Sequence, residues 1–150
     1  MATIRDTNIE KWFPSIGANY EITSPIDGSH NCIAYAADDH TKYWWPKRFY
    51  WPPGIPDEED VNSFIECFKL LGYEVCPITE SHFEQGYDKV AIYVDRNGIP
   101  THAAKQMGSG KGQWKSKLSW YKDIEHDLDG ISGNTSQAYG QIAAILKRKL

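Results

Sequence analysis

A cysteine and a histidine stand in settings that suit nucleophilic chemistry. The string Ser29-His30-Asn31-Cys32-Ile33-Ala34-Tyr35-Ala36-Ala37 indicates a turn that runs into a helix, with the thiol at or near the first helical position. Because a helix N-terminus favours a thiolate, we expect Cys32 to have a lowered pKa. Seventy residues later, Thr101-His102-Ala103-Ala104 begins an expected strand, from which His102 can serve as the base. The pair predicts a cysteine hydrolase.

Such a pair needs supporting groups. The amide N–H of Cys32 is expected to point toward a developing oxyanion, with the Asn31 side chain as a second donor. A third polar residue normally fixes the imidazole tautomer, and Ser116 on the following strand is the first choice for that role. Asp123 and Glu125 are weaker choices. The alternative is structural: Cys32 is then a small buried residue, and His102 a strand-end histidine bonded to backbone.

The segment 43–53 is unusually aromatic, with six aromatic residues in its first nine positions and prolines after them. Two interpretations stay open. The rings wall a substrate groove, or the loop packs its own rings and prolines together. The tryptophans expected to border a substrate are Trp44, Trp45, Trp51 and Trp114.

Length and composition limit the class of protein. The 150 residues predict one domain, 1–150, and 41% hydrophobic with 24% charged residues is ordinary for a soluble protein. A formal net charge of −4 argues against nucleic acid or an anionic membrane as the partner. No apolar run approaches the roughly 18 residues of a membrane span. Metal-binding spacings such as His-Glu-x-x-His are missing, so neither metal nor cofactor is expected.

The start of the chain and the cysteine count bear on the compartment. Residues 1–6 show early charge without the apolar core of a signal peptide. Three cysteines, an odd number, do not suit a disulfide scaffold. We therefore expect Cys67 and Cys76 to be free, buried thiols and the protein to be cytoplasmic, or exported as an effector without a signal peptide.

The order of elements predicts an α+β fold in which N-terminal helices pack on a small antiparallel sheet. Capping patterns and helical spacing predict helices from Thr7, from Cys32 to about Tyr43, and over 61–71. Alternation and turn signals predict the later strands. These strands are expected at 73–77, 90–94, 100–107 and 113–118, with a final helix that Asn134-Thr135-Ser136 caps and that carries Ala138, Ile142, Ile145 and Leu146 on one face.

Several strings together resemble an uncharacterised bacterial domain family, from about Pro14 onward. More loosely, the order of cysteine helix and histidine strand is similar to the papain-like superfamily, including its NlpC/P60 branch. That likeness implies a Cys–His hydrolase or acyl transferase. The chain departs from it, because Asn31-Cys32 replaces the usual Asp-Cys and the third position is not an obvious His, Asn or Gln. The resemblance includes His126, as a support in the site or packed beneath it. The strings are Asn31-Cys32-Ile33-Ala34-Tyr35-Ala36, Tyr43-Trp44-Trp45-Pro46, Tyr50-Trp51-Pro52, Thr101-His102-Ala103-Ala104, Trp114-Lys115-Ser116-Lys117-Leu118, Asp123-Ile124-Glu125-His126 and Tyr139-Gly140.

Two functional hypotheses follow. The first is a thiol-dependent hydrolase or acyl transferase acting on an amide, isopeptide or thioester bond of a protein or peptide-like substrate. Peptidases, amidases and deamidases of this kind include bacterial toxins and effectors. The second is a non-catalytic binding protein that uses segment 43–53 as its contact surface. Preferential alkylation of Cys32 over Cys67 and Cys76 separates the two. Neither substrate nor oligomeric state follows from the sequence.

Overall fold

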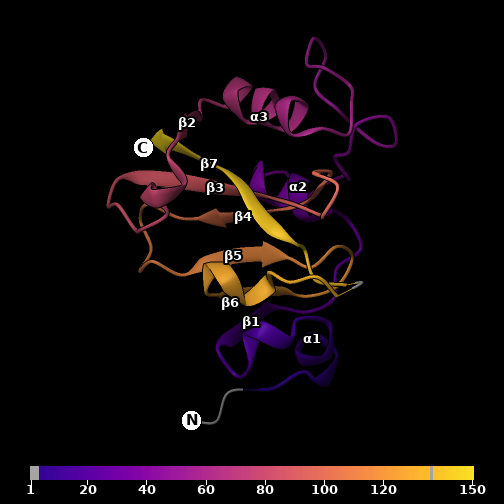
Figure 1. The fold of residues 1–150 in the computed structure, drawn as a ribbon, viewed down its shortest axis with the longest axis vertical. Coiled ribbons are helices and arrows are strands. Elements are labelled where there is room, and N and C mark those ends of the chain that lie inside the picture. The colour runs from indigo at the N-terminus through magenta and orange to yellow at the C-terminus, as the bar shows by residue number, and fades with distance from the viewer. Residues whose placement is uncertain (1–3, 136) are drawn as a thin grey trace.

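One antiparallel sheet organises the chain. The computed structural model describes residues 4–135 and 137–150, and within them seven strands form a single sheet in the order β1-β6-β5-β4-β3-β7-β2 (Figure 1). A seven-stranded antiparallel sheet with few helices confirms the predicted α+β class. The strands are β1 (Tyr20–Ser24), β2 (Glu74–Cys76), β3 (Tyr87–Val94), β4 (Pro100–Gln106), β5 (Trp114–Lys117), β6 (Asp123–His126) and β7 (Gln141–Lys149).

Three short α-helices accompany the sheet: α1 (Thr7–Trp12), α2 (Cys32–Ala36) and α3 (Val61–Leu70). Each begins after an Asp or Asn whose side chain accepts a backbone N–H of the first turn. In Figure 1, α1 lies beside β1 at one end of the sheet and α3 lies beyond β7 and β2 at the other. None of the helices in the described residues has the length and apolar character to cross a membrane.

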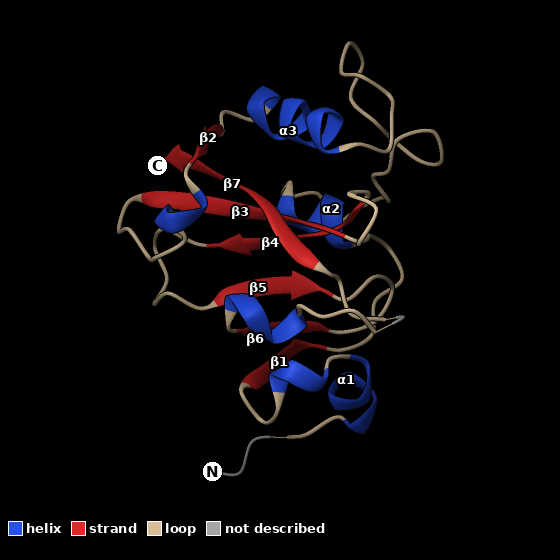
Figure 2. Cartoon of the chain, viewed as in Figure 1, coloured by secondary structure: helices blue, strands red, loops and turns tan. Residues whose placement is uncertain are grey.

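The helix that starts at Cys32 is much shorter than predicted. It ends at Ala36 instead of about Tyr43, and Asp38 takes a φ of 63°, a left-handed conformation that a helix cannot continue through. The chain from there to α3 is mostly loop (Figure 2). Segment 43–53 therefore lies in this loop, and Tyr43, where the predicted helix was to end, belongs to the loop as well.

The predicted C-terminal helix is wrong, because this segment forms β7, which pairs with β3 and β2. Ile145 belongs to a cluster on one face of the sheet and Leu146 to a cluster on the other. A strand buried on both faces has a continuous apolar run, which resembles a buried helix by its pattern alone. Of the predicted cap, Ser136 lies outside the described residues.

Two hydrophobic clusters cover the two faces of the sheet. The α1 face carries residues of α1 together with Tyr93, Ala104 and Ile145. The α2 face carries residues of α2 and α3 together with Ala103 and Leu146. Because neighbouring residues of a strand point to opposite faces, β4 contributes to both clusters. His102 pairs with Tyr93 and therefore lies on the α1 face.

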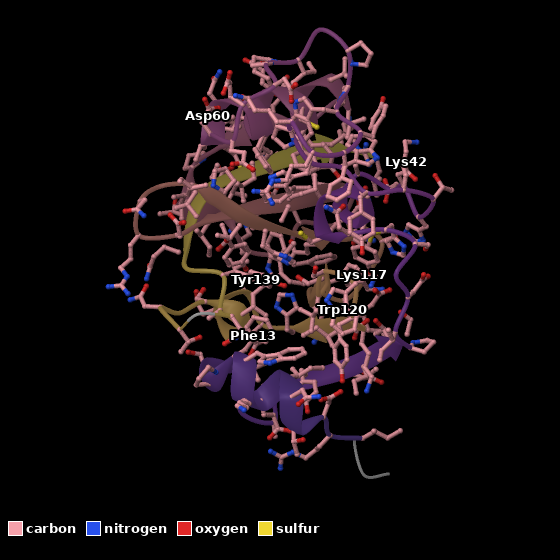
Figure 3. The ribbon with its side chains drawn as sticks, turned by 90° about the vertical axis from the view of Figure 1, so that its right-hand side faces the viewer. Phe13, Lys42, Asp60, Lys117, Trp120 and Tyr139 are labelled. Atoms are coloured by element: carbon pink, nitrogen blue, oxygen red, sulfur yellow. The ribbon has the colours of Figure 1, made fainter. Side chains whose placement is uncertain are left out.

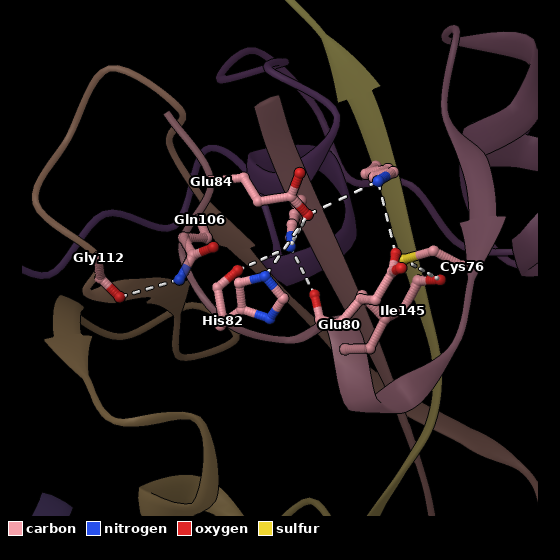
Figure 4. A network of polar contacts seen from close by, with 9 residues as sticks. Cys76, Glu80, His82, Glu84, Gln106, Gly112 and Ile145 are labelled. Carbon is pink, nitrogen blue, oxygen red and sulfur yellow. Dashed lines mark hydrogen bonds and ion pairs between the residues drawn. The ribbon is translucent and has the colours of Figure 1, made fainter. Parts of the chain in front are cut away.

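A buried lysine ties a loop to β3. Lys89 is fully buried, and its Nζ donates to the carbonyls of Glu80 at 2.5 Å and His82 at 2.7 Å and to Glu84 Oε1 at 2.8 Å (Figure 4). All three of its hydrogens therefore have acceptors. These hydrogen bonds hold the segment between β2 and β3 against β3. Because every hydrogen of the Lys89 ammonium group has an acceptor, we assign Lys89 a structural role.

Asp6 anchors α1 to the sheet, and its charge is expected to stabilise the fold at neutral pH. Burial raises the pKa of Asp6, but hydrogen bonds from Lys122 and Tyr121 outweigh this effect and lower the pKa to about 2. A lowered folded-state pKa gives stability that is present above the unfolded value and lost as pH falls through the folded value. We expect Asp6→Asn, which keeps a capping side chain, to lose about 2 kcal/mol at pH 7 and almost nothing at pH 2.

Urea denaturation at both pH values measures this difference. Asp95→Asn is the matched control, because Asp95 accepts only backbone hydrogen bonds, from Asn97 and Ile99, among the contacts of the described residues. The control should change stability little at either pH. An equal loss at pH 7 and pH 2 for Asp6→Asn would show that the carboxylate charge contributes nothing.

Candidate functional site

Asn31 fixes the turn that presents Cys32. Its Oδ1 accepts the backbone N–H groups of Ala34 and Trp44, both at 3.1 Å, and its Nδ2 donates to the Trp44 carbonyl at 2.8 Å. The side chain thus caps α2 and joins it to the aromatic loop. Only one amide hydrogen remains for the oxyanion role expected of Asn31.

Cys32 lines a pocket of about 270 Å³ and is 5% exposed. Burial raises the pKa of its thiol to about 11. The predicted lowering of this pKa is wrong for the resting protein, because α2 has only five residues and its first turn is enclosed by apolar neighbours. The pocket is lined by Asn31, Cys32, Tyr43, Trp45, Arg48, Phe49, Thr101, Ser119 and Tyr139.

His102 is completely buried on the α1 face of β4, between two aromatic rings. The Tyr93 ring centroid lies 5.7 Å away, and Tyr139 stacks on the imidazole at 4.0 Å with 6° between the planes. Burial, with His126 nearby, lowers the pKa of His102 well below its usual value. Both Cys32 and His102 are therefore uncharged at neutral pH in the resting protein.

Polar contacts on the α1 face form a chain that starts at His102. Its Nε2 lies 2.8 Å from Ser116 Oγ, which lies 2.7 Å from His126 Nε2, and His126 Nδ1 lies 2.7 Å from the Asp127 carbonyl oxygen. Ser116 thus holds the position predicted for the orienting residue. His126 extends the chain by one further member.

The Asp127 carbonyl gives this chain a direction. A carbonyl only accepts, so His126 Nδ1 carries the hydrogen, and its neutral ring leaves Nε2 as an acceptor. Ser116 must then donate to His126, and its oxygen accepts from His102 Nε2–H. The remaining nitrogen of His102, Nδ1, therefore holds a lone pair. Nδ1 is buried and has no hydrogen-bond partner among the described residues, which is unusual for a structural histidine.

Tyr139 lies between the two candidate catalytic groups. It stacks on His102, and it lines the pocket together with Cys32. Burial and the neighbouring Cys32 raise its pKa. Phe13 packs against its ring at 5.2 Å, on the side of α1 (Figure 3). Cys32 and His102 thus border the same tyrosine from opposite faces of the sheet, with no hydrogen bond from a His102 nitrogen to Cys32.

The four tryptophans expected near a substrate have different positions. Trp45 lines the pocket. Trp44 and Trp51 pack in the α2-face cluster, Trp51 against Phe64 of α3. Their indole N–H groups donate to Asp39 and to the Pro56 carbonyl. Trp114 is 4% exposed in the α1-face cluster. The aromatic segment therefore packs against itself and against α3, and its Tyr43, Trp45 and Phe49 line the pocket; the substrate groove stays a prediction.

Lys117 is a neighbour of the site to which the sequence analysis gave no role. It is fully buried, donates to the Tyr121 carbonyl, and its positive charge favours the Cys32 thiolate. Burial lowers the pKa of Lys117, against the carboxylates of Asp123 and Asp27. A signal was available: Lys115 and Lys117 alternate with Trp114 and Ser116, so both lysines lie on the other face of β5. That face is also covered, so Lys117 is buried and Lys115 is partly buried.

The site lies within the part of the chain that a family match covers. That match includes Cys32, His102, Ser116, His126 and Tyr139. The family description names no activity, so the chemistry rests on the geometry above. No curated protein and no solved structure matches the chain. The chain belongs to the family described as Domain of unknown function (DUF7689), whose model matches residues 21–147.

Proposed function

We propose that this protein is a thiol-dependent hydrolase or acyl transferase, with Cys32 as nucleophile and His102 as general base. The observation that carries the proposal is the directed chain that leaves His102 Nδ1 buried, unpartnered and bearing a lone pair. General base catalysis requires a nitrogen with a free lone pair that can accept a proton, and His102 Nδ1 meets this requirement in the resting protein. The pocket beside Tyr139 supplies the place for an acyl group.

Catalysis begins with displacement of Tyr139 by the substrate. The thiol then meets Nδ1 of His102, which takes its proton as sulfur attacks the carbonyl carbon. The amide N–H of Cys32, at the start of α2, donates to the oxyanion, and His102 returns the proton to the leaving group. A neutral pair of this kind reacts only once the substrate is bound, which protects a buried thiol from adventitious chemistry.

The proposal includes a papain-like, NlpC/P60-like arrangement of thiol, imidazole and a polar residue on the next strand. The bond attacked is an amide, isopeptide or thioester in a protein or peptide-like substrate. Arg48 and the rings of Tyr43, Trp45 and Phe49 surround the position that such a chain would take. Amidases and deamidases of this kind include bacterial toxins and effectors, so the proposal extends to such a role for this protein.

Acylation by p-nitrophenyl acetate, followed by intact-mass spectrometry and peptide mapping, tests the proposal. We expect wild type to be acylated at Cys32 and Cys32→Ser to lose this adduct. His102→Gln should slow acylation about 100-fold, the lower range for loss of a general base. Cys67→Ala, which removes a buried thiol of α3, is the control and should react as wild type. Equal rates for wild type and His102→Gln would overturn the assignment of the base.

A second candidate is a binding protein that uses the same pocket without turnover. Two observations favour it: four aromatic rings and Arg48 line the pocket, and burial raises the pKa of Cys32 to about 11. This candidate predicts that Cys32 reacts at a rate independent of His102. The His102→Gln comparison therefore separates the two functions in one experiment.

A further inference from the structure

His126 ends the series of hydrogen bonds that runs from His102 through Ser116, and it borders a second pocket. This pocket, about 240 Å³ in volume, is distinct from the one that Cys32 lines. His126 is 2% exposed, but its surroundings differ from those of His102 because Asp127 follows it and lines the same pocket. The lining residues are Asn19, Tyr20, Glu21, Gln113, Glu125, His126 and Asp127.

Asp127 favours a positive charge at His126 more than any neighbouring group does at His102. Asp127, the residue after His126, shares this pocket, whereas Glu21 and Glu125 are register partners on the opposite face of the sheet, where Glu125 pairs with Lys115. Tyr20 is the register partner of His126 in β1, and His102 reaches His126 through Ser116. Burial lowers the pKa of His126 to about 4, but the carbonyl and the charge of Asp127 act in the opposite direction. No such counterweight raises the pKa of His102.

We propose that His126 is the terminal proton acceptor of Cys32, through Ser116 and His102. This inference rests on the proposed function, in which His102 Nδ1 removes the thiol proton. It makes His126 a positioning residue that acts through two others. The buried His102 then never has to hold a full positive charge between the rings of Tyr93 and Tyr139.

The transfer balances as three coupled steps. The S–H bond of Cys32 breaks as an N–H bond forms at His102 Nδ1. The Nε2–H bond of His102 breaks as an O–H bond forms at Ser116, and the original hydroxyl hydrogen of Ser116 moves to His126 Nε2. One proton has then moved from Cys32 to His126, which gives a thiolate and an imidazolium. Its Nδ1–H continues to donate to Asp127, so no hydrogen bond at that end is lost.

His126→Gln separates proton acceptance from hydrogen bonding. The amide of glutamine can still accept from Ser116 and donate to Asp127, but it cannot take a proton. We expect acylation of Cys32 by p-nitrophenyl acetate at pH 7 to slow about 10- to 100-fold. The pH–rate profile should also change, so that the rate follows thiol ionisation alone up to about pH 11. Ser116→Ala should give the same profile, and the double variant should lose nothing more.

Three outcomes distinguish the claims. If wild type shows no acylation at Cys32, the proposed function fails. If His102→Gln slows acylation while His126→Gln keeps the wild-type rate and profile, the function stands and the relay is overturned. A lowered melting temperature with an unchanged pH profile gives His126 only a structural role and also overturns the relay. Histidine ¹⁵N spectra give a readout without turnover, and they should show the Nδ1–H form of His126 and the Nε2–H form of His102 at pH 7.

Discussion

Gly140→Ala is expected to lower the free energy of unfolding by about 4 kcal/mol, as the sum of a backbone clash and a strained conformation. A Cβ at this position would lie 1.9 Å from the Val94 carbonyl oxygen and 2.8 Å from its carbon. The φ of Gly140 is +86°, a region that side chains rarely adopt. Because β3 is paired on both sides, Val94 cannot simply move away. Urea denaturation measures the loss.

Gly98→Ala is the matched control for this substitution. Gly98 has a similar φ of +77°, but an added Cβ there would meet nothing within 4 Å. The control retains only the conformational cost, about 1 kcal/mol. Comparable losses for the two variants would contradict the close approach of Gly140 to Val94. Gly140 also follows Tyr139 directly, so its tight passage past β3 helps to hold that ring on His102.

Tyr139→Ala is expected to accelerate alkylation of Cys32 by iodoacetamide about 100-fold at pH 7. The ring lines the pocket beside the thiol, and burial holds the pKa of Cys32 at about 11. Opening the site should return this pKa toward the roughly 8.5 of a free thiol, which raises the thiolate fraction by about that factor. Trapping the protein at intervals and mapping the labelled peptides gives the rate for each cysteine.

Two controls make this result specific. Tyr139→Phe keeps the ring and should react about as slowly as wild type. Cys67 and Cys76 are buried in the same chain, and burial raises the pKa of each. If Tyr139→Ala merely unfolded the protein, all three thiols would become reactive together. Unchanged Cys32 reactivity in Tyr139→Ala would mean that this ring does not seal the site.

Local signals sufficed for much of the site. The sequence predicts the helix that starts at Cys32, and the structure shows Asn31 as its N-cap, because the Asn31 side chain accepts a first-turn N–H. Alternation and turns predicted β4 and β5, and adjacent strands bring His102 and Ser116 to 2.8 Å. These features depend on neighbours in sequence or on one hairpin, which is the range over which patterns are informative.

Features that depend on distant contacts were not predictable. The run in β7 reads as a helix until β3 pairs with it. β1 was missed, and the acid-rich alternation of Asp123–His126 hid β6, since its buried members are only Ile124 and His126. Tyr139 stacks on His102 although 37 positions separate the two residues in the sequence (139 − 102 = 37). No local sequence pattern could therefore predict that the Tyr139 ring lies on this imidazole. The burial that raises the pKa of Cys32 also depends on residues far from it in the sequence, so local patterns could not predict it.

The most direct test of the central claim is the distance from Cys32 Sγ to His102 Nδ1 in a crystal structure of the protein alkylated at Cys32 by iodoacetamide. We expect the adduct to displace Tyr139 from its stack, so that Nδ1 comes within about 4 Å of the sulfur or accepts a hydrogen bond from the adduct amide. An adduct that occupies the pocket while Tyr139 stays on the imidazole, with Nδ1 still unpartnered, would contradict the pairing of these two residues and with it the hydrolase.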